Sequence, residues 1–167
     1  YQLFEVAEDQ VLSLTPEQRL FLENVWETFD DAGYTRDTLK ALQTQYKQGI
    51  GVFVGSMYNQ YSWSQPNVDD AVVSATATDW QIANRVSHFF DLTGPSLAIN
   101  SACSSSISAI HSACESLKLK NCSMAIAGGV NLTLDPSKFD ALKKTHFLGS
   151  GHQSKSFGTG DGYIPGE

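Results

Sequence analysis

The fold is decided by the stretch Gly94-Pro95-Ser96-Leu97-Ala98-Ile99-Asn100-Ser101-Ala102-Cys103-Ser104-Ser105-Ser106. A short apolar segment leads into Cys103, small residues surround it, and an amphipathic stretch at 107–119 follows. This order predicts a strand, a tight turn and a helix, with the Cys103 thiol in the first turn of the helix. A thiol there lies at the positive end of the helix dipole, which favours the nucleophilic thiolate. Cys103 is therefore a candidate to carry a covalent acyl group.

A second interpretation of Cys103 is structural, because cysteine is among the most buried residue types and often fills a core. Two local features favour the nucleophile. The residues that flank Cys103 are small and polar. The position after a strand and before a helix is also the geometry that presents a nucleophile at the top of an α/β sheet.

The other two cysteines, Cys114 and Cys122, are predicted to fill the core or its margin. Three cysteines are an odd number and make a poor disulfide framework. Cys103 and Cys114 would share a helix face, but a rise of about 1.5 Å per residue separates them by about 16 Å. They cannot share a metal ion or a disulfide.

Composition limits the class of protein. The chain has 167 residues, 41% of them hydrophobic, which is enough for one domain with its own core. A net charge of −7 argues against an extended nucleic-acid surface. No apolar run approaches the roughly 18 residues that span a bilayer, and no signal peptide is visible. We expect a cytoplasmic protein without nucleic-acid or membrane partners. Because the chain starts at Tyr1 and stops after a glycine-rich turn, we expect an internal fragment.

Helical and strand patterns alternate along the chain. Thr15 is a predicted N-cap, Pro16 suits the first helical position, Gln18 completes a capping box, and Gly33 marks the end of this first helix. We expect further helices over residues 76–90, 103–120 and 135–144, and strands over 49–57, 96–100 and 124–130. The helix over 76–90 should turn its apolar residues inward: Trp80, Ile82, Ala83, Val86 and Phe89.

Such alternation predicts an α/β fold with a largely parallel sheet and helices on both faces. The small residues at 101–106 predict that other backbone packs closely against the start of the helix that follows Cys103. Gly128-Gly129 predicts a similar close approach at the end of a strand.

Four histidines are candidate bases for Cys103: His88, His111, His146 and His152. His111 would lie about 12 Å farther along the same helix, too far for proton transfer. His88 is expected to stabilise the C-terminal end of its helix. His146 and His152 lie in or near a loop, and nothing local requires either to approach Cys103.

Motifs along nearly the whole chain resemble those of β-ketoacyl synthase domains from bacterial modular polyketide synthases. The run from Gly94 to Ser106 is similar to the active-site sequence of that family. Further similar motifs are Leu14-Thr15-Pro16-Glu17-Gln18-Arg19-Leu20, Trp26-Glu27, Asp31-Ala32-Gly33, Gly51-Val52-Phe53-Val54-Gly55, Ala83-Asn84-Arg85-Val86-Ser87, Phe90-Asp91-Leu92-Thr93, Ala127-Gly128-Gly129-Val130 and Asp161-Gly162-Tyr163-Ile164-Pro165-Gly166-Glu167. Met57-Tyr58-Asn59 and the ending at 161–167 look most like synthases whose acyltransferase is a separate protein.

The resemblance implies a thiolase-like fold, layered α/β/α, of which residues 1–167 would form a single partial domain without its C-terminal half. It implies that Cys103 takes an acyl chain from the phosphopantetheine arm of an acyl carrier protein. Decarboxylative Claisen condensation with a malonyl thioester would follow. The backbone N–H of Cys103 would form half of an oxyanion hole. The family's two catalytic histidines lie in motifs that match none of the four histidines here.

The resemblance also implies partners. These are acyl carrier proteins, other polyketide synthase domains, and a second copy that dimerises through the strand near Ser96–Ser101. No cofactor or metal ion is expected to bind directly. Two departures stand out: the family usually has Asp-Thr at Asn100-Ser101 and Asp-Gly-Arg-Cys at Gly151-His152-Gln153-Ser154.

Three alternatives remain open. A non-elongating synthase would keep Cys103 and pass acyl groups on without condensing them. A non-catalytic dimerisation or docking module would keep its function when Cys103 is replaced. A cysteine hydrolase would need a histidine and an orienting Asn or Asp near Cys103, and no such motif is present.

Overall fold

The computed structural model describes residues 3–8, 11, 14–58, 60–61 and 78–165. Predictions for Asn59, for residues 76–77 of the second expected helix and for Gly166-Glu167 lie outside these residues. The chain divides into two compact units, Tyr1–Asn131 and Leu132–Glu167. None of the described helices is long and apolar enough to cross a membrane.

The first unit begins with helix α1, Pro16–Asp31. The Gln18 N–H donates to the Thr15 hydroxyl at 3.3 Å, so Thr15 caps the helix as predicted, and Gly33 follows the helix with a φ of 77°. The predicted capping box is incomplete, because the Thr15 N–H does not donate to the Gln18 side-chain oxygen. The buried side chains of α1 include Phe21, Leu22, Val25 and Phe29. Leu20 and Trp26, which share the apolar spacing, are exposed.

Helix α2, Arg36–Tyr46, was not predicted. Thr35 and Thr38 form a reciprocal capping box: the Thr38 N–H donates to the Thr35 hydroxyl at 3.3 Å, and the Thr35 N–H donates to the Thr38 hydroxyl at 2.7 Å. The usual partner at the third helical position is Glu or Gln, so a threonine there is a weaker sequence signal. Only Leu39 of this helix is buried, which leaves no long apolar stripe to detect.

The described sheet has three parallel strands in the order β2-β1-β3. Strand β1, Ile50–Gly55, is buried along its whole length, as expected for a central strand of a parallel sheet. Strand β2, Ser96–Ile99, and strand β3, Met124–Gly129, lie on either side of it. The strand predictions are confirmed: the starts at Ser96 and Met124 agree, and the other bounds differ by one or two residues.

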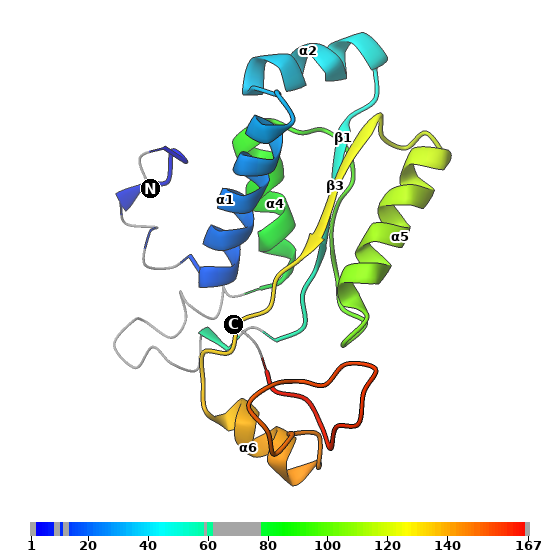
Figure 1. The fold of residues 1–167 in the computed structure, drawn as a ribbon. Coiled ribbons are helices and arrows are strands. Elements are labelled where there is room, and N and C mark those ends of the chain that lie inside the picture. The colour runs from blue at the N-terminus through cyan, green and yellow to red at the C-terminus, as the bar shows by residue number, and fades with distance from the viewer. Residues whose placement is uncertain (1–2, 9–10, 12–13, 59, 62–77, 166–167) are drawn as a thin grey trace. The chain divides into compact units, whose positions relative to one another are not determined.

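Helices cover both faces of this sheet, as predicted (Figure 1). Helices α1 and α4, Trp80–Phe90, lie on one face. Helix α5, Ser105–Lys118, lies on the other. Four of the five residues predicted to point inward from α4 are buried, but Trp80 is 55% exposed, because it is the first residue of the helix.

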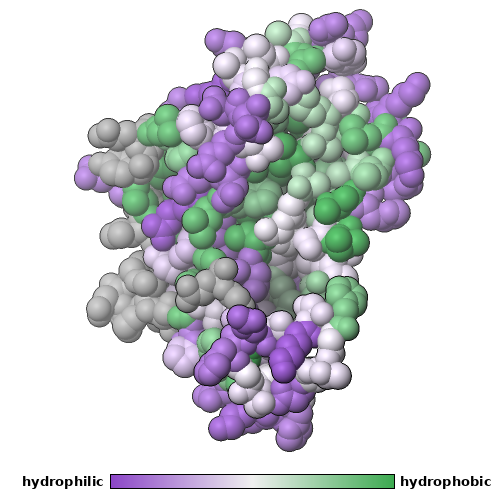
Figure 2. Space-filling view, viewed as in Figure 1, coloured by the Kyte–Doolittle hydropathy of each residue, from purple (hydrophilic) through white to green (hydrophobic). Residues whose placement is uncertain are grey.

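Helix α5 turns its small residues toward the sheet. The buried side chains Ser105, Ala109, Ala113 and Ser116 recur at helical spacing. Its larger residues Ile107, Ile110 and Leu117 are exposed. Figure 2 shows apolar residues gathered on the visible face over β3 and toward α5. The helix therefore sits close to the strands, since only small side chains separate them.

The second unit contains helix α6, Ser137–Lys144, close to the predicted bounds. Asp135 accepts a hydrogen bond from the Ser137 N–H at 2.8 Å and so satisfies a free donor at the helix start. Farther on, Gly149 and Tyr163 are joined by a backbone hydrogen bond of 3.0 Å.

Candidate functional site

The candidate site is the turn between β2 and α5. Strand β2 ends at Ile99 and α5 begins at Ser105, so the chain reverses within five residues. Ala102 has a φ of 55°, in the left-handed region that a side chain disfavours. Such a conformation costs on the order of 1–3 kcal/mol and persists only where surrounding contacts impose it. Cys103 follows this residue directly and is exposed.

Cys103 lies two residues before the helix, not in its first turn as the sequence predicted. Ser104 is the N-cap, and α5 runs from Ser105 to Lys118 rather than over 103–120. The Ser104 hydroxyl donates to the Ser101 carbonyl at 2.8 Å, and the Ser105 hydroxyl donates to the Ala102 carbonyl at 2.6 Å. Serine side chains that bond nearby backbone in this way stabilise a turn in competition with a helix.

Serine hydroxyls organise the whole turn. Besides its bond to Ala102, the Ser105 hydroxyl accepts from the Ser101 N–H at 3.0 Å. The Ser101 and Ser108 hydroxyls are 2.8 Å apart and so tie the turn to the next turn of the helix. The serine-rich composition therefore supplies the turn's hydrogen bonds.

Asn100 ties the turn to the segment after β1. Its side-chain oxygen accepts from the Ala102 N–H at 3.1 Å. Its side-chain nitrogen donates to the Met57 carbonyl at 3.3 Å. An aspartate would keep the acceptor but lose the donor, so asparagine makes one contact more than aspartate could at this position.

Two glycines allow α5 to start close to the strands. A Cβ on Gly55 would lie 2.5 Å from the Ser105 carbonyl carbon, and one on Gly129 would lie 2.8 Å from the Ser106 Cβ. Both distances are shorter than non-bonded atoms tolerate. The predicted close approach of backbone at this turn, and at the Gly128-Gly129 strand end, is confirmed.

The three cysteines have different surroundings, and all are free thiols. Cys122 is buried, with its sulfur 3.3 Å from the Ser116 hydroxyl, as predicted for a core cysteine. Cys114 is exposed, so its prediction as a core filler is wrong. Helix α5 contacts the sheet through Ala113, and the neighbouring position 114 therefore faces away from the strands.

No described histidine forms a hydrogen bond with the Cys103 thiol. His111 lies two helical turns along α5, and His88 lies in the last turn of α4, as the sequence indicated. His146 and His152 belong to the second unit. Among the described residues, no group of three or more His, Cys, Asp or Glu side chains could hold a metal ion.

A buried carboxylate that the sequence analysis missed lies in α1. Both carboxylate oxygens of Glu17 are buried without a hydrogen-bond partner in the structure. Burial raises the pKa of this carboxyl above its ordinary value of 4.5; the nearby Glu17 N–H and Thr15 hydroxyl oppose this effect without cancelling it, and the charge of Asp79 adds a smaller increase. The sequence shows Glu17 only as an acidic residue in the first turn of a helix. A carboxylate is common and usually exposed there, so its position did not indicate burial.

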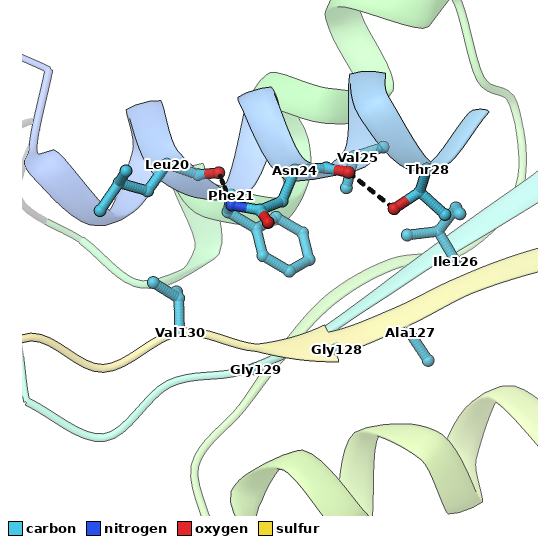
Figure 3. A pocket seen from close by; sticks show the side chains of 10 residues that line it. All are labelled: Leu20, Phe21, Asn24, Val25, Thr28, Ile126, Ala127, Gly128, Gly129 and Val130. Carbon is cyan, nitrogen blue, oxygen red and sulfur yellow. Dashed lines mark hydrogen bonds between the residues drawn. The ribbon is translucent and has the colours of Figure 1, made fainter. Parts of the chain in front are cut away.

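A groove lies between α1 and β3, with a volume of about 250 Å³ (Figure 3). Its lining is mostly apolar and includes Phe21, Ile126 and Val130. The two polar side chains in it, Asn24 and Thr28, donate to carbonyls of their own helix. The groove therefore offers no reactive group, and Cys103 is not among its lining residues.

Known proteins are similar to this chain in sequence and in fold. The family model for the N-terminal domain of β-ketoacyl synthases matches residues 1–167. Polyketide synthase PksR of Bacillus subtilis is 66% identical over all of this chain. Polyketide synthase ThaG of Burkholderia thailandensis is 38% identical over 98% of it.

A solved ketosynthase structure has the same fold as this chain. The oxazolomycin ketosynthase domain OzmH KS7 of Streptomyces albus superposes with a TM-score of 0.84, at 37% identity over 98% of this chain. The chain spans 28% of that structure, 6% of PksR and 3% of ThaG. The strand–turn–helix around Cys103 thus occurs in a chain that is similar to polyketide synthases in sequence and to a ketosynthase domain in structure.

Proposed function

Since the chain belongs to the β-ketoacyl synthase family, as a match to its N-terminal domain, we propose that it carries the acyl-accepting cysteine of a polyketide ketosynthase. The observation that supports this most is the placement of Cys103. It is an exposed thiol, directly after a left-handed residue and two residues before a helix that packs on a parallel sheet. This geometry presents a nucleophile to a substrate that arrives from outside.

The proposed first step is transthioesterification. The Cys103 sulfur, as thiolate, attacks the carbonyl carbon of an acyl thioester on the phosphopantetheine arm of an acyl carrier protein. A carbon–sulfur bond to Cys103 forms and the bond to the phosphopantetheine sulfur breaks. The released thiolate takes up the proton that Cys103 gave up. The Cys103 N–H would donate to the oxyanion that forms in between.

In the proposed second step a malonyl thioester on a carrier protein loses carbon dioxide. The resulting carbanion attacks the acyl group on Cys103, which forms the β-ketoacyl product and releases the cysteine thiolate. In the family this step uses two histidines from motifs that this chain does not match. We therefore assign the chain the loading of the acyl group and not the whole condensation.

The proposed partners follow from this chemistry: acyl carrier proteins, other synthase domains, and a second copy across β2. Leu97 of this strand is 47% exposed, and β2 lies at an edge of the described sheet. The Met57-Tyr58 segment and the residues from Asp161 onward support a synthase whose acyltransferase is a separate protein. Three free cysteines fit a cytoplasmic setting.

The test is acyl loading in the ketosynthase that carries this chain. A short acyl thioester of N-acetylcysteamine should add one acyl group, and peptide mass spectrometry should locate it on Cys103. Cys114 is the matched control, since it is also exposed and lies on the helix that follows Cys103. C103A should abolish loading and C114A should leave it unchanged. Equal acylation of both cysteines would contradict the assignment of Cys103 as the nucleophile.

The same protein separates the alternatives. With a malonyl carrier protein added, an elongating synthase releases carbon dioxide and a β-ketoacyl product, whereas a non-elongating one returns the acyl group unextended. A docking module would support product formation equally well with C103A.

A further inference from the structure

We propose that Asn100 and Ser105 are positioning residues that together hold Ala102 in its left-handed conformation and so orient Cys103. This inference rests on the proposed role of Cys103 as the acyl acceptor. Neither residue contacts the substrate in this scheme. Both act through the backbone of the residue that precedes the nucleophile.

The two side chains bind Ala102 from opposite ends of the residue. The Asn100 side-chain oxygen accepts from the Ala102 N–H at 3.1 Å. The Ser105 hydroxyl donates to the Ala102 carbonyl at 2.6 Å, and the Ser105 N–H donates to the same carbonyl at 3.0 Å. Both polar groups of the Ala102 backbone are thereby satisfied while its φ stays at 55°.

The two clamping residues are themselves attached to the rest of the fold. Ser105 is 5% exposed because its backbone lies against Gly55 of β1. Its hydroxyl also accepts from the Ser101 N–H at 3.0 Å, so one atom joins both sides of Ala102. Asn100 donates to the Met57 carbonyl at 3.3 Å and so connects the turn to the segment after β1.

The conformation of Ala102 sets the direction of Cys103, because φ of one residue rotates everything that follows it. An alanine left without these contacts favours a negative φ. The Cys103 N–H would then turn away from the position where it stabilises an oxyanion. A displacement of about 1 Å at a reacting group can cost about 100-fold in rate.

The test compares two reactions of Cys103 in the ketosynthase that carries this chain. Acylation by an N-acetylcysteamine thioester needs the oriented N–H, whereas alkylation by iodoacetamide needs only an accessible thiol. S105A should slow acylation 10- to 100-fold, on the order expected for misplacement, and leave alkylation within about twofold. N100A should also slow acylation, and because Asn100 is exposed, we expect this variant to fold. S106A is the matched control, since no hydrogen bond involves the Ser106 hydroxyl in the described structure.

A glycine at position 102 provides the specific rescue, because glycine adopts a positive φ without strain. A102G should restore most of the acylation rate to S105A and to N100A. A general loss of folding would not be rescued in this way. Slowed acylation with no recovery in either double variant would overturn the positioning role.

The outcomes separate the two proposals. If the unaltered protein is not acylated at Cys103, both the function and the positioning role are wrong. If it is acylated and neither S105A nor N100A slows the reaction, only the positioning role is wrong.

Discussion

Gly55 at the end of β1 and Ser105 at the start of α5 are in contact through their backbones. A Cβ at position 55 would lie 2.5 Å from the Ser105 carbonyl carbon and 2.7 Å from its oxygen. This contact joins the buried central strand directly to the turn that carries Cys103. The position of the candidate nucleophile therefore depends on a residue almost fifty positions earlier in the sequence.

We expect G55A to destabilise the fold by about 3 kcal/mol, at the upper end for overpacking, because the clash is with backbone and no side chain can move away. Urea unfolding followed by circular dichroism measures the loss. G158A is the control, since its Cβ would meet its nearest neighbour, the Lys155 carbonyl oxygen, at an ordinary 3.5 Å. A loss below about 0.5 kcal/mol for G55A would show that α5 can shift off the strand.

Gln43 joins α2 to the start of β1 and to the segment between α4 and β2 through four hydrogen bonds. Its side-chain oxygen accepts from the Thr93 N–H at 2.8 Å, the Thr93 hydroxyl at 3.0 Å and the Ile50 N–H at 3.2 Å. Its side-chain nitrogen donates to the Asp91 carbonyl at 3.0 Å. Q43A should cost about 2 kcal/mol, because these backbone groups lose their partner.

The same unfolding experiment has two comparisons for Gln43. Q43E keeps the acceptor and loses the donor, so it should fall between Q43A and the unaltered protein. Gln45 is exposed two residues farther along α2, and Q45A should change the free energy of unfolding by less than about 0.5 kcal/mol. Equal effects of Q43A and Q45A would refute the bridging role of Gln43.

Glu17 should make stability depend on pH. Because burial raises the pKa of its carboxyl, the folded state binds this proton more tightly than the unfolded state. The contribution of Glu17 to stability is then greatest at or below the ordinary pKa of 4.5 and is lost as the pH rises through the folded pKa. The loss amounts to about 1.4 kcal/mol for each pKa unit of the increase.

E17Q removes this titration, so its stability should decline less than that of the unaltered protein as the pH rises from 4.5 toward neutrality. Unfolding free energies across that range test the difference. E23Q, at an exposed position of the same helix, serves as the control and should keep the original slope. An unchanged slope in E17Q would contradict a raised pKa for the buried Glu17 carboxyl.

The cysteines should be alkylated in a fixed order in the native protein. Cys103 and Cys114 are exposed and should react with iodoacetamide, with Cys103 the faster of the two. Cys122 is 2% exposed and should react only as the chain unfolds. Peptide mass spectrometry with and without urea measures this. Labelling of Cys122 at the native rate of Cys114 would contradict its burial.

The proposed dimer through β2 makes its own prediction. Pro95 and Ile99 accept hydrogen bonds from β1 through their carbonyls, so the intervening Ala98 N–H points away from β1, toward the outer edge of the described sheet. A98P removes this donor, and proline is tolerated on that side of an edge strand. Sedimentation should show a shift from dimer to monomer for A98P and none for A98S. A dimer that survives A98P would place the interface elsewhere.

Much of the fold could be predicted from local patterns. The apolar run at Ile50–Val54 and the capped start at Thr15-Pro16 specify a strand and a helix by themselves, because burial and capping act over a few residues. The alternation of such elements was enough for a parallel sheet covered on both faces. Helix α2 was not predicted, because a Thr–Thr capping box and one buried leucine are weak signals in a sequence.

The sequence by itself also determined which residue is the candidate nucleophile, since Cys103 sits between an apolar strand and an amphipathic helix among small residues. Only the tertiary structure decided how that cysteine is held. The left-handed Ala102, the delayed helix start and the exposure of Cys114 all follow from where α5 packs on β1 and β3. That packing depends on contacts such as Gly55 with Ser105, which join distant positions and leave no local pattern in the sequence.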